Sequence, residues 1–438
     1  MSTAFYLLTI LLASTPVLAI ADGTFAQHVI VFAAALIMAA AVTSPEAEFQ
    51  EFAQLSKRFS LAMLFPILWM VLQAVPLPFA SLVNPIWSTT AIALKEPSLP
   101  GHISLDPGST LRSIIFYLTI LSLVISTVII TKDRHRAETT LFALSVVTTF
   151  MSAEVLIGRL DAFAGMIPAA GTARGAPFAA TAALAVMANT AVISRAIERQ
   201  RKRSASQNLF SSPLFVGLIS GLGGIIIALA AMRVLAQGNL FLATGLGFVV
   251  FVLIAAVRRL GLRSWPAAIL FTVLLAIAAV VAWPHFQASS AIGLLGFVTA
   301  GTSADALVLA QRALSVTPLM GSGVGTFELL WRAYLDFGAK PILTAPSTAV
   351  SIAIEWGQPA LLILAGFAAQ LFFFTMRGAI RRGRDSFFAS AGAAGILVVL
   401  CESFVDSSLL SPTVQIIVAV MTGLGLSQST GRTSGLEE

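Results

Sequence analysis

A glycine-rich run is the part of this sequence whose residue types could bind a charged substrate. It reads Gly321-Ser322-Gly323-Val324-Gly325-Thr326-Phe327 and lies within 285–345, the longest stretch too polar for hydrocarbon in an otherwise almost continuously apolar chain. Such a run can turn sharply and present several backbone N–H groups to an anion. No strand is expected before it and no Lys follows it, which argues against a dinucleotide fingerprint and a P-loop. We expect either an anion-binding turn or a plain turn.

Ionisable residues near the ends of apolar segments form a second group of candidates. In hydrocarbon such residues are costly, so they mark functional sites. The expected topology places them at outer helix ends, which favours one shared cavity that opens outward; the alternative is that each lies at the interface or pairs locally. These residues are Glu154, Arg159, Asp161, Arg174, Arg233, Glu355, Glu402 and Asp406.

The histidine and cysteine content predicts neither a metal site nor a disulfide. His28, His102, His135 and His285 lack the spacing of metal ligands. Cys401 is the single cysteine, so it has no intramolecular partner. We therefore predict no metal and no cofactor.

The composition requires lipid as the solvent for most of the chain. Of 438 residues, 57% are hydrophobic and 11% are charged, whereas soluble domains carry about 25% charged residues. A helical crossing needs roughly 20 apolar residues. We predict a single all-α polytopic membrane domain over 1–438, with about twelve transmembrane helices. They are expected at 4–20, 26–43, 60–75, 111–131, 139–158, 177–195, 212–235, 239–257, 265–284, 346–376, 386–402 and 408–426.

The distribution of basic residues predicts the orientation. Most of the 26 Lys and Arg residues fall in alternate loops, which places those loops and both termini in the cytoplasm. The basic run at 199–203 is interpreted as an inner-leaflet anchor, with RNA or anionic-lipid contact as the alternatives. No nucleic-acid partner is predicted. The first segment lacks a basic region before its apolar part, so we interpret it as a retained helix; cleavage after Ala21 is the alternative.

The large outer loop at 285–345 is expected to carry a helix of its own. Between 303 and 317, Leu307, Ala310 and Leu314 recur at helical spacing, and Pro318 ends the pattern. This amphipathic helix is predicted to lie along the membrane surface.

Five short stretches, in order along the chain, carry a resemblance to a known family. They are Leu72-Gln73-Ala74-Val75-Pro76-Leu77-Pro78, Ile103-Ser104-Leu105-Asp106-Pro107, Pro318 to Glu328, Ala345-Pro346-Ser347-Thr348 with Glu355-Trp356-Gly357, and Glu402-Ser403-Phe404-Val405-Asp406 through Ser411-Pro412. Together they resemble the motifs of the O-antigen ligase and polymerase family. These are multi-helix membrane proteins that handle polysaccharide carried on a polyprenyl diphosphate. The resemblance covers about residues 60 to 425.

The resemblance implies glycan transfer at the outer face of the bacterial inner membrane. The donor would be a polyprenyl-diphosphate-linked glycan, and the acceptor a lipid or a glycan. Arginines would hold the diphosphate, and a histidine would assist the attacking hydroxyl. Fixed guanidinium groups can stabilise a departing diphosphate without a metal ion, and a base with a pKa near neutrality can take the proton of the acceptor.

Residue by residue, the family pattern is only partly present. Arg233 stands where the family has the arginine of an S-R-G sequence, and Arg174 matches the arginine of an A-R-G sequence. Ser303 replaces the arginine that opens the surface helix, which leaves Arg312 as a substitute. These three arginines, with Gly321, Gly323 and Gly325, are the predicted diphosphate-binding residues.

The histidine of the family is replaced by Pro346, which cannot act as a base. Glu355 is the nearest retained carboxylate and is the candidate catalytic residue, although it lies nine positions further on, about two and a half helical turns. Proline suits the first turn of a helix, so a structural role for Pro346 is also predicted.

Three functions follow from these features. The first is a surface-polysaccharide ligase or polymerase. The second is a non-catalytic relative that binds a lipid-linked glycan or another polysaccharide assembly protein. The third is a secondary transporter, which the helix number allows but which usually has two related halves that this sequence lacks.

Overall fold

The computed structural model describes residues 3–21, 23–43, 46–79, 81–158, 177–200, 213–235, 238–260, 304–334, 345–382 and 385–430, and all regular structure within these ranges is helical. Nine helices of the described part are long and apolar enough to cross a membrane. They are α1 (Thr3–Ile20), α2 (Gly23–Val42), α3 (Glu46–Ala74), α5 (Pro107–Ile130), α6 (Arg134–Ile157), α7 (Pro177–Gln200), α8 (Pro213–Leu235), α9 (Gly238–Leu260) and α14 (Gln358–Arg381). The chain is therefore a multi-pass, all-helical membrane protein, as predicted.

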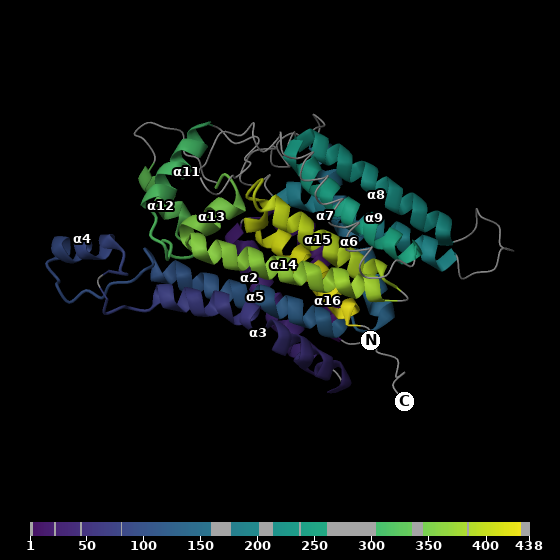
Figure 1. Cartoon of the computed structure of the whole chain (residues 1–438), viewed down its shortest axis with the longest axis horizontal. Helices are drawn as coiled ribbons and strands as arrows, with labels where there is room; N and C mark the ends of the chain where they lie inside the picture. Colours follow the sequence, from purple (N-terminus) through teal and green to yellow (C-terminus); the bar gives the residue numbers. More distant parts are fainter. Residues whose placement is uncertain are drawn as a thin grey trace.

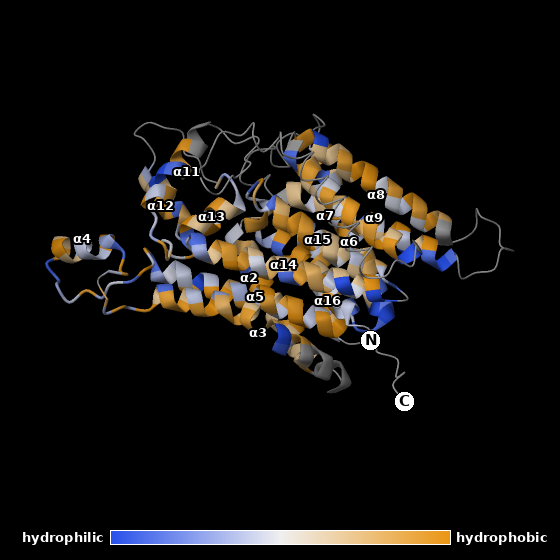
Figure 2. Ribbon diagram, in the orientation of Figure 1, coloured by the Kyte–Doolittle hydropathy of each residue, from blue (hydrophilic) through white to orange (hydrophobic). Residues whose placement is uncertain are grey.

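Two further helices, α15 (Phe387–Glu402) and α16 (Pro412–Ser429), lie inside the bundle (Figure 1). The remaining helices are short: α4 (Pro85–Leu94), α11 (Ala304–Val316), α12 (Phe327–Tyr334), α13 (Thr348–Glu355) and the 3-10 helix η4 (Ser408–Leu410). Apolar residues line the long helices, and hydrophilic residues gather toward their ends (Figure 2).

Small residues let the long helices approach closely. A Cβ atom on Gly392 would lie 2.6 Å from the Cα atom of Gly425, where α15 crosses α16. A Cβ atom on Gly224 of α8 would meet Asn189 of α7 at 2.3 Å. Asn189 in turn accepts a hydrogen bond from the Ser145 hydroxyl of α6 at 2.8 Å. Close backbone approach and buried polar contacts of this kind hold helices together in lipid, where the hydrophobic effect cannot.

Contacts between helix ends define two ends of the bundle. Arg195, near the end of α7, contacts Glu138, near the start of α6. Gln428, near the end of α16, donates to the carbonyl of Thr131, just beyond α5. We call this the terminal end, because the first and last helices begin and end there (Figure 1). The opposite end, which carries α11, α12 and α13, is called the loop end.

Most expected helices are found, and two expectations on length are wrong. The third helix, expected at 60–75, begins at Glu46. The tenth, expected as one helix over 346–376, is two helices, α13 and α14, that break at Gly357. Gly357 has φ of 88°, which a continuous right-handed helix cannot contain.

The surface helix expected at 303–317 is present as α11. Helices α4 and α12 were not predicted. The helix expected at 265–284 lies outside the described residues, so the total of twelve stays a prediction.

Candidate functional site

Gln73 joins three separate parts of the chain at the loop end. Its side-chain amide donates to the carbonyl oxygens of Met320 at 2.7 Å and Glu355 at 2.9 Å. Its amide oxygen accepts the N–H of Val324 at 3.2 Å. The side chain is buried. Gln73 therefore ties the end of α3 to the glycine turn (residues 318–327) and to the end of α13.

The segment that precedes α5 packs on the same turn. The N–H of Ser104 donates to the backbone carbonyl of Gln73, and the N–H of Leu105 donates to the carbonyl of Ser322 at 2.8 Å. The Thr110 hydroxyl donates to the carbonyl of Val324 at 3.0 Å. Four of the five motif-bearing stretches thus meet at Gln73 and the glycine turn.

The fifth stretch reaches the turn through α13. The N–H of Thr348 donates to the carbonyl of Asp406 at 2.8 Å, and the N–H of Ala349 donates to the carbonyl of Ser403 at 2.7 Å. Ser347 is the N-cap, and its hydroxyl accepts the N–H of Val350. The carbonyls that follow α15 therefore fix the start of α13, and α13 fixes the turn at its other end.

The glycines of the turn are required by backbone conformation and by space. Gly321, Gly323 and Gly325 have φ of 80°, 104° and 83°, values that side chains disfavour. A Cβ atom would lie 2.2 Å from the carbonyl oxygen of Glu355 at Gly321, and 2.1 Å from the Ser104 hydroxyl at Gly323. Any larger residue would force the segments apart.

The backbone N–H groups of the turn bind the protein itself. Gly321 donates to Pro318, Ser322 to Ile354, Gly323 to the Glu355 carbonyl, and Thr326 to the Gly323 carbonyl. Val324 donates to Gln73, as described above. The N–H of Phe327 donates to Oε1 of Glu355 at 3.0 Å, and the N–H of Gly325 also donates to that residue's side chain. These N–H groups are therefore not free to bind an external anion, because the side chain of Glu355 already accepts their hydrogen bonds.

Glu355 is thus the side chain that the turn binds. Burial raises the pKa of this carboxyl to about 7, and the N–H groups of Phe327 and Gly325 oppose that rise. The residue is buried beneath the turn. Its side chain holds the turn closed, which is a positioning role; a catalytic role for Glu355 stays a prediction. Pro346 is buried directly before the N-cap Ser347, two positions ahead of the first helical residue, Thr348, so it precedes the first turn in which a proline was expected.

Glu402 and Asp406 form an acid pair bridged by one hydroxyl. The Ser408 hydroxyl lies 3.3 Å from Oε1 of Glu402 and 2.5 Å from Oδ1 of Asp406. Burial raises the pKa of Asp406 to about 6, and the hydrogen bonds from Ser408 oppose that rise. Glu402 is fully buried, and its Oε2 atom has no hydrogen-bond partner. This pair lies at the start of α13, so it can influence the turn through that helix.

The predicted arginines are not brought together at the turn. Arg233 is exposed near the end of α8, which runs antiparallel to α7 and therefore ends at the loop end. Its helix packs on α6, α7 and α9, away from the glycine turn. Arg312 is exposed on α11, which packs on α12 and α13. Arg174 and Asp161 lie outside the described residues.

Glu154 also lies at the loop end, near the end of α6. It is buried, and its Oε2 atom has no hydrogen-bond partner. The described ionisable candidates therefore share one end of the bundle, as expected. They lie on different helices, and hydrogen bonds through α13 connect Glu355 with Glu402 and Asp406. The single shared cavity stays a prediction.

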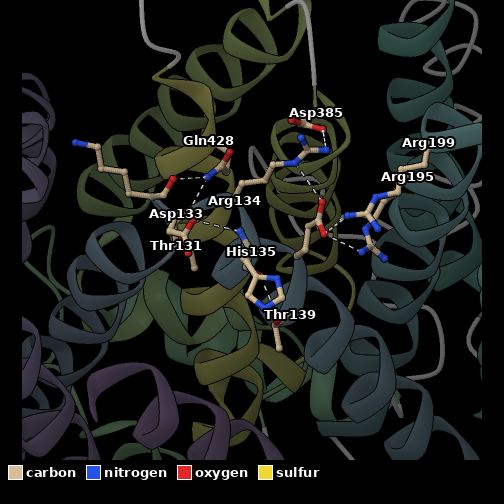
Figure 3. A network of polar contacts seen from close by, with 11 residues as sticks. Thr131, Asp133, Arg134, His135, Thr139, Arg195, Arg199, Asp385 and Gln428 are labelled. Carbon is tan, nitrogen blue, oxygen red and sulfur yellow. Dashed lines mark hydrogen bonds and ion pairs between the residues drawn. The ribbon is translucent and has the colours of Figure 1, made fainter. Parts of the chain in front are cut away.

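An ion-pair network centred on Glu138 lies at the terminal end and was not predicted. The basic residues at 199–203 were expected to be an anchor at the inner leaflet. Glu138 is buried and contacts Arg195 at 2.8 Å, Arg134 at 3.3 Å and Arg199 at closer range. Arg134 also contacts Asp385 at 3.0 Å. Figure 3 shows these arginines converging from α6 and α7. The spacing of Arg134 and Glu138, four positions apart on a helix, was the feature that could have predicted part of it.

No group of three or more His, Cys, Asp or Glu side chains that could hold a metal ion occurs within the described residues. Comparison with known proteins finds no family model that matches this chain and no curated protein that is significantly similar to it. The motifs and the geometry at the loop end are therefore the basis for a functional proposal.

Proposed function

We propose that this protein acts on a glycan carried on a polyprenyl diphosphate, at the outer face of a bacterial cytoplasmic membrane. The observation that carries the proposal is the meeting of five separate stretches at the loop end. These stretches are the ones that resemble the O-antigen ligase and polymerase family. Gln73, Ser104, the glycine turn, α13 and the segment after α15 contact one another through backbone and side-chain hydrogen bonds.

The orientation in this proposal follows from the basic residues. Arg134, Arg195, Arg199 and Arg258 lie at the terminal end, and basic residues concentrate on the cytoplasmic side of membrane proteins. The terminal end and both termini would face the cytoplasm. The glycine turn would face outward, where lipid-linked glycans are assembled into surface polysaccharide.

The proposed chemistry is metal-independent transfer of the glycan to a lipid or glycan acceptor. Exposed guanidinium groups at the loop end, Arg233 and Arg312, would bind the diphosphate, together with Arg174. The glycine turn would hold the segments of the loop end in place and would not itself bind the phosphates. The oxygen of the acceptor hydroxyl forms a bond to the anomeric carbon of the donor sugar, the bond from that carbon to the diphosphate breaks, and the hydroxyl proton passes to a base. Asp406, whose pKa burial raises to about 6, is a candidate for this base.

A second candidate is binding of the lipid-linked glycan without transfer, with delivery to another assembly protein. The observation that favours it is the combination of Pro346 in place of the family histidine with a Glu355 carboxylate already engaged by the turn. Both candidates require the diphosphate to bind at the loop end. They differ in whether the glycan leaves the polyprenyl carrier.

The experiment that tests the proposal measures both steps on purified protein in lipid nanodiscs. Polyprenyl-diphosphate glycan is supplied, and bound lipid and released polyprenyl diphosphate are quantified. Arg233→Ala should weaken binding. Arg259→Ala removes an exposed arginine in the last turn of α9, at the terminal end of the bundle, and should not weaken binding. Binding with release supports transfer, and binding without release supports the second candidate. Equal binding by both variants and the parent would contradict the assignment of the diphosphate to Arg233.

A further inference from the structure

The segment between α3 and α5 stands apart from the bundle. Residues 75–103, here called the tongue, carry α4 beyond the ends of α3 and α5 (Figure 1). None of the residues of α4 is buried. Several large apolar side chains are exposed, among them Ile92 at 79% and Leu94 at 64%. The others are Val75, Phe79, Leu82 and Ile86.

The tongue is an ordered element with defined ends. Asn84 caps α4 by accepting the N–H of Ile86, and Lys95 ends the helix in a left-handed conformation. Its root is closed by hydrogen bonds from the N–H of Leu77 to the carbonyl of Gly101 and from the N–H of Asn84 to the carbonyl of His102. The exposed apolar side chains therefore belong to a structured surface.

The charge pattern identifies what covers this surface. From Phe59 to Leu94 the sequence contains no Asp, Glu, Lys, Arg or His. A surface facing water carries many charges, and a protein-docking patch usually has a polar, charged rim. A surface of exposed apolar side chains without charges, in which only small hydroxyl groups such as those of Ser88 and Thr89 intervene, is instead typical of contact with lipid. The first charges after this stretch, Lys95 and Glu96, come where α4 ends.

The apolar surface of the tongue continues one that already faces lipid. On α3, Leu61, Leu64 and Leu68 are exposed, and on a membrane-spanning helix such side chains contact hydrocarbon. This row runs through Val71 and Val75 into the tongue without a charged residue. The exposed surface of the tongue and that of α3 are therefore both expected to contact lipid.

The length of α3 leaves room in the bilayer for the tongue. Its candidate membrane span, Leu55–Ala74, rises about 30 Å at 1.5 Å per residue, which matches the hydrocarbon core of about 30 Å, and the headgroups extend the bilayer to about 40–45 Å. The headgroup layer and its boundary with the acyl chains therefore lie at and beyond the end of α3. The chain that enters this zone is the tongue.

We propose that the tongue inserts into the lipid leaflet at the loop end, with Ile86, Ile92 and Leu94 in the boundary between acyl chains and headgroups. The same element is connected to the glycine turn, because Trp87 donates to the carbonyl of Ser104 at 3.0 Å and Leu105 donates to Ser322. Insertion would hold the turn at a fixed height above the membrane surface. The proposal does not depend on glycan transfer.

The test measures the solvent around the tongue directly. A spin label is attached at Ile92→Cys, and separately at Ile86→Cys, in the full chain with Cys401→Ser, in nanodiscs that contain one copy each. Collision rates with oxygen, which dissolves in lipid, and with a water-soluble nickel chelate are compared. Leu64→Cys on α3 provides the lipid reference, and Arg332→Cys on α12, whose side chain is 63% exposed, provides the water reference.

Insertion predicts an oxygen-to-nickel ratio several-fold above that of the Arg332 label and close to that of the Leu64 label, at both tongue positions. A ratio equal to that of the Arg332 label would mean that the tongue stands in water, and it would overturn the proposal. Low collision rates with both reagents would mean that protein covers the surface, which also overturns it. Ratios that rise only when several copies share one disc would assign the surface to a second copy of the chain.

Discussion

Replacing Gln73 by leucine tests the arrangement of the loop end at its most connected residue. Leucine has a similar volume but neither donates nor accepts hydrogen bonds. The substitution leaves the Val324 N–H and the Met320 carbonyl without their side-chain partner, whereas the Glu355 carbonyl keeps the N–H of Gly323 at 3.1 Å. Each buried polar group left unpaired costs about 1–3 kcal/mol. The glycine turn should therefore lose about 2–6 kcal/mol of local stability.

Amide hydrogen exchange reports this loss where it occurs. At a fixed pH and in the same detergent or nanodisc, the peptide that covers 320–327 should exchange at least about thirty-fold faster in Gln73→Leu, since each 1.4 kcal/mol is a factor of ten. The matched control is Gln370→Leu, the same change at an exposed position of α14. If the 320–327 peptide of Gln73→Leu exchanged within a factor of about three of the parent, the loss of stability would be below 1 kcal/mol and the reasoning would be refuted. Equal changes in Gln73→Leu and Gln370→Leu would refute it as well.

Three further perturbations test other parts of the account. Gly357→Ala should lower the stability by more than about 2 kcal/mol, because φ is 88° and the new Cβ would lie 2.0 Å from a carbonyl oxygen, whereas Gly366→Ala meets no atom within 4 Å and should change little; thermal unfolding of the two variants measures the difference. Glu138→Gln should cost about 2 kcal/mol by removing the buried carboxylate that Arg195 and Arg199 contact, against less than about 1 kcal/mol for Glu328→Gln, which affects an exposed pair; similar unfolding midpoints would contradict a structural role for the network. Glu355 has a folded pKa of about 7, above its unfolded value, so its contribution to turn stability is largest below pH 4.5 and falls by about 3 kcal/mol as the pH rises through 7; the protection factor of the turn amides, which removes the intrinsic rise of exchange with pH, should fall over this range, and Glu355→Gln should abolish that fall, so the same pH profile in both proteins would count against it.

The sequence was sufficient to predict the helices that lipid requires. Runs of apolar residues between short polar segments predicted the ends of α1, α2 and α8 to within three residues. The thickness of the bilayer sets the length of such a run, so the run can be recognised in one sequence. The amphipathic spacing in 303–317 predicted α11 for a similar reason. The break at Gly357 was not predicted, since the apolar character continues across it and only the packing against Leu319 requires a positive φ.

The sequence predicted several residues of the candidate site but not the contacts that they make. The glycine pattern indicated a turn, but whether its N–H groups face a ligand or the protein depends on where Glu355 lies, and the two are separated by about thirty residues. Gln73 was noted only as part of a resembling stretch, because a single buried glutamine has no periodic pattern around it. The partners of Glu138 on α7 come from a helix about sixty positions further along the chain. Such long-range contacts depend on how the helices pack, and the spacing of residues along the sequence does not predict that packing.

The central claim is that the loop end binds a polyprenyl diphosphate, and a photoreactive polyprenyl diphosphate tests it most directly. After irradiation in nanodiscs, peptides that carry the adduct are located by mass spectrometry, with the corresponding polyprenol as the control for contact through the lipid tail alone. The account predicts diphosphate-dependent adducts in loop-end segments, at 304–334 and around Arg233. Adducts confined to the terminal end near Arg195 and Arg199, or the same adducts with the polyprenol, would contradict it.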